Sequence, residues 1–444
     1  MVQGILILVV FLILAALMVT RKIPTFVAMI LLAILTVVIA RVPIVGVDDE
    51  GAQIGWLHLV IEGGATRMAA AVMAVVFGSW MGQMLNRSGV TETIIKKSAE
   101  LGGDRPLVIA ILLSIAVALL FTTLAGLGSV IMVGSIVLPI LISVGIPALT
   151  AAGVMLMSFN IGLTFNMANW QTFSGIFSLE IAEIQGFMIY MLVATSVLTL
   201  AYILIQFKRD GRKFAFSAPT EETDSSDEEP PVDSDDARQL KGFLGFLAII
   251  SPLVPIALVI FLQVPIIPAF MVGIVWLLIF TAKSFSKAMN MLTRTCLDGF
   301  TAAAPALILF ISLGMLINAV MNPMVREVLN PLLIAVVPTN QIIYIIFFII
   351  VAPLSLYRGP MNLFGFGSGI AALIIGLGTL NPLAVMGAFL SAERIQGAGD
   401  PTNTQNVWTA NFTKVDVNSI TKMVIPYLWI IAVIGVIVSG ILYF

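Results

Sequence analysis

Long uninterrupted apolar runs fill most of this sequence, and few structures can accommodate them. The chain of 444 residues is 59% hydrophobic and only 10% charged, whereas a soluble globular protein carries about 25% charged residues. Of its 46 charged side chains, 16 fall between Lys208 and Lys241. The rest of the chain therefore lacks the charge to cover a water-exposed surface and must lie mostly in lipid. A soluble enzyme, a nucleic-acid-binding protein and a secreted disulfide-linked domain are excluded.

The apolar runs predict an all-α, polytopic membrane protein. Because the runs are continuous and do not alternate, they favour a helical bundle over a β-barrel. Several are shorter than the roughly 20 residues that a full crossing needs, which predicts segments that enter the membrane without crossing it. The runs lie at 4–20, 24–40, 67–85, 107–121, 129–144, 148–164, 187–207, 243–262, 265–282, 300–320, 341–357, 363–380, 383–395 and 423–444.

An acidic segment divides the chain into two halves of similar size. Residues 208–241 contain ten acids and few apolar residues, a composition that predicts a disordered linker. We therefore expect an N-terminal transmembrane repeat at 1–207 and a C-terminal one at 242–444. At an offset of 236 residues Glu62-Gly63 aligns with Asp298-Gly299, and the order of apolar runs around the two pairs is the same.

Basic residues near the span ends predict how the halves are oriented. The segments that they place on the cytoplasmic side are 86–106, 208–241, 283–298 and 413–422. The acidic loop 42–56 and both termini then lie outside. The first repeat starts outside and the second inside, so the repeats are predicted to be inverted, as expected of secondary transporters. Four full crossings between 105 and 208 would fit this orientation, and so would a re-entrant hairpin at 107–144 followed by an interrupted transmembrane helix. The short arms and the glycine-rich tip favour the hairpin, and the matching hairpin of the second repeat is expected at 341–380.

Polar residues at membrane depth mark the predicted site, because irregular backbone is tolerated there only when it is buried or lines a wet cavity. An arginine at a hairpin tip is costly in the membrane and suits a carboxylate. The interrupted helices, at 164–175 and 396–406, offer carbonyl, amide and hydroxyl oxygens for Na⁺ and helix N-termini for an anion. The predicted substrate-binding residues are Thr122, Thr123, Ser129, Arg358, Asn362 and Thr402. The predicted ion-binding residues are Asn166, Asn169, Glu393, Asp400, Asn403 and Thr404.

Three of these residues have alternative interpretations. Arg358 can instead anchor an exposed tip to lipid headgroups. Glu393 is either a carrier of H⁺ or Na⁺ or a charge that pairs with a basic neighbour. Because adjacent helical side chains point about 100° apart, Glu393 and Arg394 need not pair with each other. Asp400 followed by Pro401 predicts a helix start, with Asp as N-cap and Pro as the first helical residue. An ordinary extramembrane loop is the alternative for this segment.

This architecture resembles the ion transporter superfamily of secondary carriers, which includes gluconate, citrate and dicarboxylate carriers and some sodium/proton antiporters. The first half is most similar to gluconate-permease-type and citrate carriers, through VVFGSWMGQMLNRSGVTETIIKKSAELGGDRPLVIAILLSIAVALLF and the following GSVIMVGSIVLPILISVGIP. The Ser-Asn-Thr signature of the dicarboxylate members is absent, and its nearest counterparts are Ser158-Phe-Asn160 and Thr402-Asn403-Thr404.

The sequence and the resemblance together predict a multi-pass carrier of the cell (inner) membrane that is not an enzyme. It is expected to couple H⁺ or Na⁺ to symport of a small organic carboxylate of the gluconate, citrate or dicarboxylate type, by alternating access. The alternatives are a Na⁺/H⁺ antiporter on the same scaffold and the membrane subunit of a binding-protein-dependent carboxylate uptake system. The expected partners are the lipid bilayer, the organic anion and the cation, with a homodimer left open and no nucleic acid. No cofactor or metal is expected beyond Na⁺ as a coupling ion.

Overall fold

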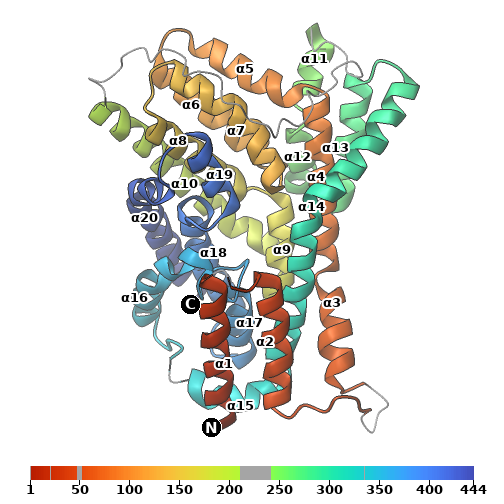
Figure 1. Ribbon diagram of the computed structural model, residues 1–444, viewed down its shortest axis with the longest axis vertical. Coiled ribbons are helices and arrows are strands. Elements are labelled where there is room, and N and C mark those ends of the chain that lie inside the picture. The colour runs from red at the N-terminus through yellow and green to blue at the C-terminus, as the bar shows by residue number, and fades with distance from the viewer. Residues whose placement is uncertain (1, 21, 48–52, 211–241, 335) are drawn as a thin grey trace.

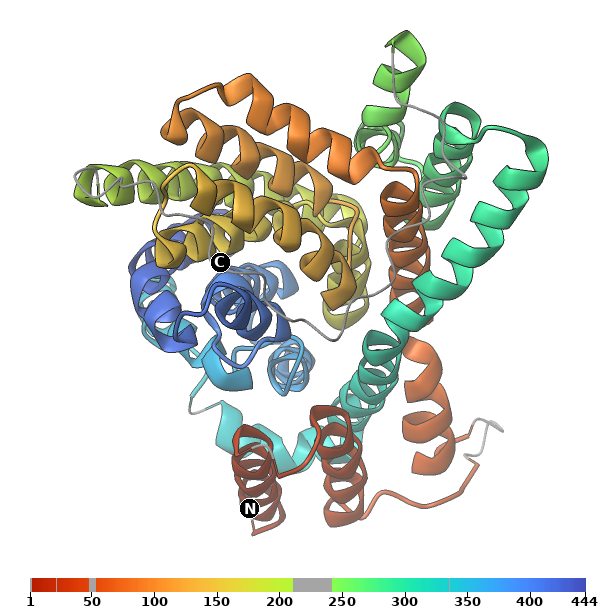
Figure 2. The same ribbon diagram turned by 45° about the horizontal axis from the view of Figure 1, so that its top comes forward.

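The computed structural model describes residues 2–20, 22–47, 53–210, 242–334 and 336–444. Figures 1 and 2 show these residues as a bundle of helices. An isolated β-bridge joins Val47 and Gln53. Within the described ranges, six helices are long and apolar enough to cross a membrane, or up to eight if each of two bent helix pairs is one span. The prediction of an all-α polytopic membrane protein is confirmed. Most of the predicted linker lies outside the described residues.

Each half builds the same series of helices. In the first half these are α1 (Val2–Val19), α2 (Thr25–Ile39), a π-helical turn (Leu57–Glu62), α3 (Gly63–Arg67), α4 (Ala69–Arg87), α5 (Val90–Gly102), α6 (Pro106–Leu120), α7 (Gly126–Ser143), α8 (Ala148–Thr164), α9 (Met167–Phe177) and α10 (Ile181–Asp210). In the second half they are α11 (Gly242–Ile249), α12 (Leu253–Leu262), α13 (Ile266–Thr281), α14 (Phe285–Met321), α15 (Pro323–Leu333), α16 (Gln341–Val351), the 3₁₀ helix η3 (Ala352–Arg358), α17 (Gly367–Leu377), α18 (Pro382–Gly399), α19 (Thr404–Phe412) and α20 (Val417–Tyr443).

The two halves are inverted repeats, and their longest helices show it. A Cβ atom on Gly64 would lie 2.5 Å from the Met315 Cα, and one on Gly299 would lie 2.6 Å from the Trp80 Cα. The early part of the span 57–87 therefore packs against the late part of α14, and its late part packs against the early part of α14. The matched helices run antiparallel, and the small residues at their crossings allow the backbones to approach closely.

Both predicted hairpins and both predicted interruptions are present. α6 and α7 form the first hairpin, and α16, η3 and α17 form the second. α8 and α9 meet at an angle of 59° across a short break. The corresponding helices α8 and α18, and α9 and α19, start about 235 residues apart in the sequence, which matches the predicted offset.

The helix boundaries differ from the predictions in several places. The first break is confined to Phe165 and Asn166, because Asn166 caps α9 and residues 167–175 are helical. Likewise Gln396–Gly399 complete α18, so the second break covers only 400–403. The expected helix start at Asp400 is wrong, since Asp400 ends α18 and Asn403 occupies the N-cap position of α19.

The centre of the molecule is formed by α8 and α18. Every residue of α18 from Ala384 to Gly399 is buried, and so are most residues of α8. α18 is packed against α20, η3, α8, α17 and α10. A helix that is buried all round normally carries apolar residues, yet α18 contains Glu393, Arg394 and Gln396 in its last two turns. These polar side chains lie where the two repeats meet.

Candidate functional site

The central helices cross at a reciprocal pair of hydrogen bonds. The Asn160 side-chain amide on α8 donates to the Arg394 carbonyl on α18 over 2.9 Å, and the Arg394 guanidinium donates to the Asn160 carbonyl over 3.1 Å. The same guanidinium nitrogen donates to the Thr164 hydroxyl over 2.9 Å. Asn160 and Arg394 are separated by about the repeat offset, so each occupies the other's position in the opposite repeat. The crossing therefore lies on the axis that relates the two repeats.

Glu393 and Arg394 form an ion pair at this crossing, with exposed side-chain fractions of 1% and 0%. Glu393 therefore does pair with a basic neighbour, which was one of its two interpretations. The pairing occurs even though adjacent helical side chains point about 100° apart. Within the described part of the chain, three buried polar atoms here have no hydrogen-bond partner: Glu393 Oε1, Arg394 Nε and Asn160 Oδ1. Buried polar groups are nearly always partnered, so these atoms indicate a place for water or a bound species.

Asn166 ties the tip of the first hairpin to the first interrupted helix. Its side-chain amide donates to the carbonyls of Phe121 and Leu124, over 2.9 and 3.0 Å. Its side-chain oxygen accepts from the Asn169 backbone amide over 3.1 Å and so caps α9. One buried side chain thus satisfies a backbone amide at the start of α9 and two carbonyls of the hairpin tip, groups of the kind that helix ends leave unpaired.

Asp400 makes the corresponding connection in the second half. It is fully buried, and one carboxylate oxygen accepts from the backbone amide of Arg358, at the tip of the second hairpin, over 3.2 Å. The other oxygen accepts from the Thr402 backbone amide and hydroxyl, over 2.8 and 2.7 Å. The Asp400 carboxylate therefore joins the second hairpin tip to the second break, as Asn166 joins the first tip to the first break.

The backbone at this second tip is strained. Tyr357 and Arg358 have φ angles of 55° and 56°, in the left-handed region that side chains other than glycine rarely adopt. Strain of this kind costs on the order of 1–3 kcal/mol and concentrates at functional sites. The bond from Arg358 to Asp400 helps to hold the tip in this conformation.

A cavity of about 290 Å³ opens beside this tip. It is lined by Arg358, Tyr357, Thr402 and the segment around the α1–α2 connection, which contributes Met18, Ile23, Pro24 and Thr25. The cavity combines one guanidinium, two hydroxyl groups from threonines and an apolar wall. The structure therefore brings two of the predicted substrate-binding residues, Arg358 and Thr402, to one cavity, with Asp400 directly behind them.

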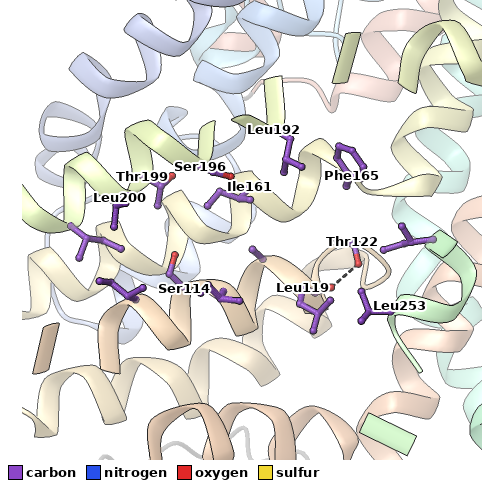
Figure 3. A pocket seen from close by; sticks show the side chains of 15 residues that line it. Ser114, Leu119, Thr122, Ile161, Phe165, Leu192, Ser196, Thr199, Leu200 and Leu253 are labelled. Atoms are coloured by element: carbon purple, nitrogen blue, oxygen red, sulfur yellow. Dashed lines mark hydrogen bonds between the residues drawn. The ribbon is translucent and has the colours of Figure 1, made fainter. Parts of the chain in front are cut away.

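A second cavity, of about 470 Å³, lies between α6, α8, α10 and α12. Figure 3 shows it lined mainly by apolar side chains, with Ser114, Thr122, Ser196 and Thr199 among them. The Thr122 hydroxyl donates to the Leu119 carbonyl over 2.6 Å. Thr122, which is also a predicted substrate-binding residue, therefore lines a different cavity from Arg358.

The remaining predicted residues support the two tips. Thr123, Ser129 and Asn362 are buried, and their side chains donate to carbonyls of Leu120, Ala125 and Ser355 respectively. Asn403 exchanges hydrogen bonds with Gln396, over 2.8 and 3.2 Å. Asn169 is half-buried, and Thr404 is exposed at the start of α19.

Two residues at the centre, Asn160 and Arg394, were not among the predicted site residues. Both lie in or beside segments rich in polar residues, Asn160 in Ser158-Phe-Asn160 and Arg394 next to Glu393. The sequence offset of 236 residues places Asn160 opposite Gln396, and only the offset of 234 between the observed starts of α8 and α18 places it opposite Arg394. Their joint burial at the crossing makes them candidates for function.

Solved structures of two transporters are among those that share this fold. The YdaH transporter of Alcanivorax borkumensis, whose crystal structure is reported to reveal an unusual topology, is 13% identical, and the match covers 94% of this chain and 97% of that one with a TM-score of 0.58. MtrF of Neisseria gonorrhoeae, reported to illuminate a class of antimetabolite efflux pumps, is 12% identical over 96% of this chain and 95% of that one, with a TM-score of 0.54. No family model matches the chain, and no curated protein is detectably similar in sequence.

The chain therefore shares the fold of these two transporters. The structural likeness extends over nearly the full length of all three chains. It does not test membership of the ion transporter superfamily specifically, so that resemblance, the carboxylate substrate and symport stay predictions.

Proposed function

We propose that this protein is a secondary active transporter that couples a cation to the movement of a small organic carboxylate by alternating access. The observation that carries the proposal is the cavity between the second hairpin tip and the second break, with Arg358 and Thr402 in its wall. Its volume is at the lower end of the range for ligand pockets, which favours an anion of a few carbon atoms. Inverted repeats with discontinuous helices bind their substrates in such places.

The chemistry of the cavity favours a carboxylate. A guanidinium presents a planar fork of donors that matches a carboxylate, and the Thr25 side chain adds a hydroxyl to the same cavity. The apolar residues Met18, Ile23 and Pro24 suit a short carbon chain. Asp400 places a carboxyl group behind the tip. Such a group attracts a cation and not an anion, so it favours a coupling cation nearby.

Substitution of Arg358 tests the substrate. A hydrogen bond to a charged group contributes about 1.5–3 kcal/mol, and each 1.4 kcal/mol changes the affinity tenfold. Arg358→Gln should therefore weaken carboxylate binding roughly ten- to a hundredfold. Arg358→Lys should restore only part of the affinity, because the fork is lost. The measurement is the affinity of purified protein for gluconate, succinate and citrate at fixed pH and Na⁺.

Arg105→Gln is the matched control, since Arg105 is exposed at the start of α6 and away from both cavities. It should bind carboxylates as the unmodified protein does. Unchanged affinity of a folded Arg358→Gln protein would remove Arg358 from the site and contradict the proposal.

The fully buried Asp400 also favours a second candidate, a Na⁺/H⁺ antiporter on the same scaffold. Proteoliposomes loaded with labelled gluconate, succinate or citrate, with and without pH and Na⁺ gradients, distinguish the two. Symport requires carboxylate accumulation that depends on one of the gradients. Cation exchange with no carboxylate movement in either direction would favour the antiporter.

A further inference from the structure

The ion pair on the repeat axis has features that packing alone does not explain. Replacing a buried ion pair by apolar residues is often neutral or stabilising, and this pair lies within one helix, so it does not itself join α18 to α8. Glu393 Oε1 and Arg394 Nε are also buried without a partner among the described residues. Half of the carboxylate is thus unused by the protein. The position, at the interface of inverted repeats, is where coupling ions bind in such transporters.

Glu393 has one charged neighbour, Arg394, among the contacts of the described residues. α8, α17 and α19 contain no acid, base or tyrosine. Asp400 and Arg358 lie beyond the end of α18, and Asp400 is about 10 Å along the axis at 1.5 Å per residue. The remaining titratable residues on the packed elements are Tyr357 on η3, Glu183, Tyr190, Tyr202, Lys208, Arg209 and Asp210 on α10, Tyr344 on α16, and Lys422, Tyr427 and Tyr443 on α20.

Building on the proposed function, we propose that Glu393 is the proton-binding residue that couples H⁺ to carboxylate transport, with Arg394 as its counter-charge. A proton from water adds to the Glu393 carboxylate and gives the neutral acid, and no other bond is made or broken. The pair then changes from zero net charge to +1. Release of the proton to water on the other side of the membrane restores the Glu393 carboxylate and the ion pair with Arg394.

The arrangement favours H⁺ over Na⁺ at this position. A sodium ion bound to Glu393 would lie beside the Arg394 guanidinium, and like charges in a site of low dielectric repel strongly. Protonation removes the carboxylate charge without placing a second ion there. The guanidinium remains held by the Asn160 carbonyl and the Thr164 hydroxyl, so it keeps partners when Glu393 is neutral.

A carboxylate in the cavity and a proton on Glu393 then bind cooperatively. The anion stabilises the positively charged form of the pair, and protonation attracts the anion by the same factor, since linkage is reciprocal. Affinity for the carboxylate should therefore be high at low pH and fall as pH rises through the titration of Glu393. One linked proton allows a fall of up to about tenfold per pH unit.

Purified protein tests this coupling through the pH dependence of binding. Affinity for gluconate, succinate and citrate is measured between pH 6 and pH 8 for unmodified protein, Glu393→Gln and Glu327→Gln. Gln imitates the protonated acid, so Glu393→Gln should bind with an affinity that does not change with pH. Glu327 is exposed on α15, and Glu327→Gln should keep the slope of the unmodified protein. In proteoliposomes, Glu393→Gln should exchange carboxylate but not accumulate it on a pH gradient.

Proton uptake by the unmodified protein gives a test that needs no variant. Adding gluconate to protein in weakly buffered solution should remove about one proton per bound anion within the titration range. Binding without proton uptake, or a Glu393→Gln protein that keeps the pH slope, would overturn the coupling role and leave the carboxylate site standing. Absence of carboxylate binding at every pH would contradict the proposed function itself. Arg358→Gln should lower affinity at each pH and retain the slope, which separates the two roles.

Discussion

Asn166 shows how much of this fold can depend on a single buried amide. Its side chain accepts from one helix start and donates to two carbonyls of a hairpin tip, and it is 2% exposed. Loss of a helix cap costs about 1 kcal/mol, and each buried group left without a partner costs about 1–3 kcal/mol. A cap that faces water incurs only the first cost, because water can bond to the groups that the lost side chain leaves.

Asn166→Ala should therefore lower the apparent melting temperature more than Asn381→Ala does. Asn381 is also a helix N-cap, for α18, but it is exposed and its side chain accepts only from Leu383 in the described residues. The expected cost is about 2–5 kcal/mol for Asn166→Ala and about 1 kcal/mol for Asn381→Ala. Thermal unfolding of the two purified variants in the same detergent gives the comparison. Equal losses would mean that the tip contacts contribute nothing to stability.

Individual side chains were predictable where their chemistry conflicts with the membrane. Arg358 and Thr402 were selected because charged and hydroxyl groups beside glycine and proline are costly in lipid, and the structure places both in one cavity. Asn160 and Arg394 are absent from the predicted site, although an arginine inside the apolar run 383–395 is costly in lipid. Their importance depends on a contact between residues 234 apart, which local sequence does not reveal.

At the scale of elements, length was the informative signal. Apolar runs too short to span the bilayer predicted hairpins and interrupted helices, and both occur in each half. Boundaries were less predictable, because caps are set by side chains that contact other segments. The run 243–262 is bent by 62° between α11 and α12, and α5 and α15 were not predicted, since they are amphipathic helices without a long apolar run.

Close helix crossings should be intolerant of added volume at specific glycines. A Cβ atom on Gly314 of α14 would lie 2.1 Å from the Gly64 carbonyl oxygen, whereas one on Gly186 of α10 would meet nothing within 4 Å. Overpacking costs about 1–3 kcal/mol, but alanine in place of glycine favours a helix by about 1 kcal/mol. Gly314→Ala should therefore lower folded yield and melting temperature, and Gly186→Ala should leave them unchanged or raise them. A stable Gly314→Ala protein would show that α3 and α14 can separate at little cost.

The whole molecule is organised by its inverted symmetry, which explains features that single residues and helices leave unexplained. The long matched helices are antiparallel, and Asn160 and Arg394 bond reciprocally at the centre. α7 packs against α19 while α17 packs against α9, so each hairpin contacts the interrupted helix of the other half. When two similar halves have opposite orientations, they can exchange conformations. The site between them then opens to one side of the membrane or to the other, which is the basis of alternating access.

Inversion makes a prediction about sidedness that equivalent positions can test. Asp104, between α5 and α6, and Thr339, between α15 and α16, are both exposed and lie 235 residues apart. Figure 1 places these two connections toward opposite ends of the molecule. The distribution of basic residues predicts that Asp104 is cytoplasmic and Thr339 is outside. Each position is changed to cysteine in a Cys296→Ser background, because Cys296 is the chain's single cysteine.

An impermeant thiol reagent added to intact cells should label Thr339→Cys and spare Asp104→Cys, and permeabilised cells should label both. The background protein should stay unlabelled, which controls for other reactive groups. Labelling of Asp104→Cys alone would reverse the orientation but keep the inversion, because the two positions would still lie on opposite sides. Labelling of both in intact cells would place equivalent loops on one side. That result would contradict the inversion, and with it the argument that Asn160 and Arg394 lie on an axis between two oppositely oriented halves.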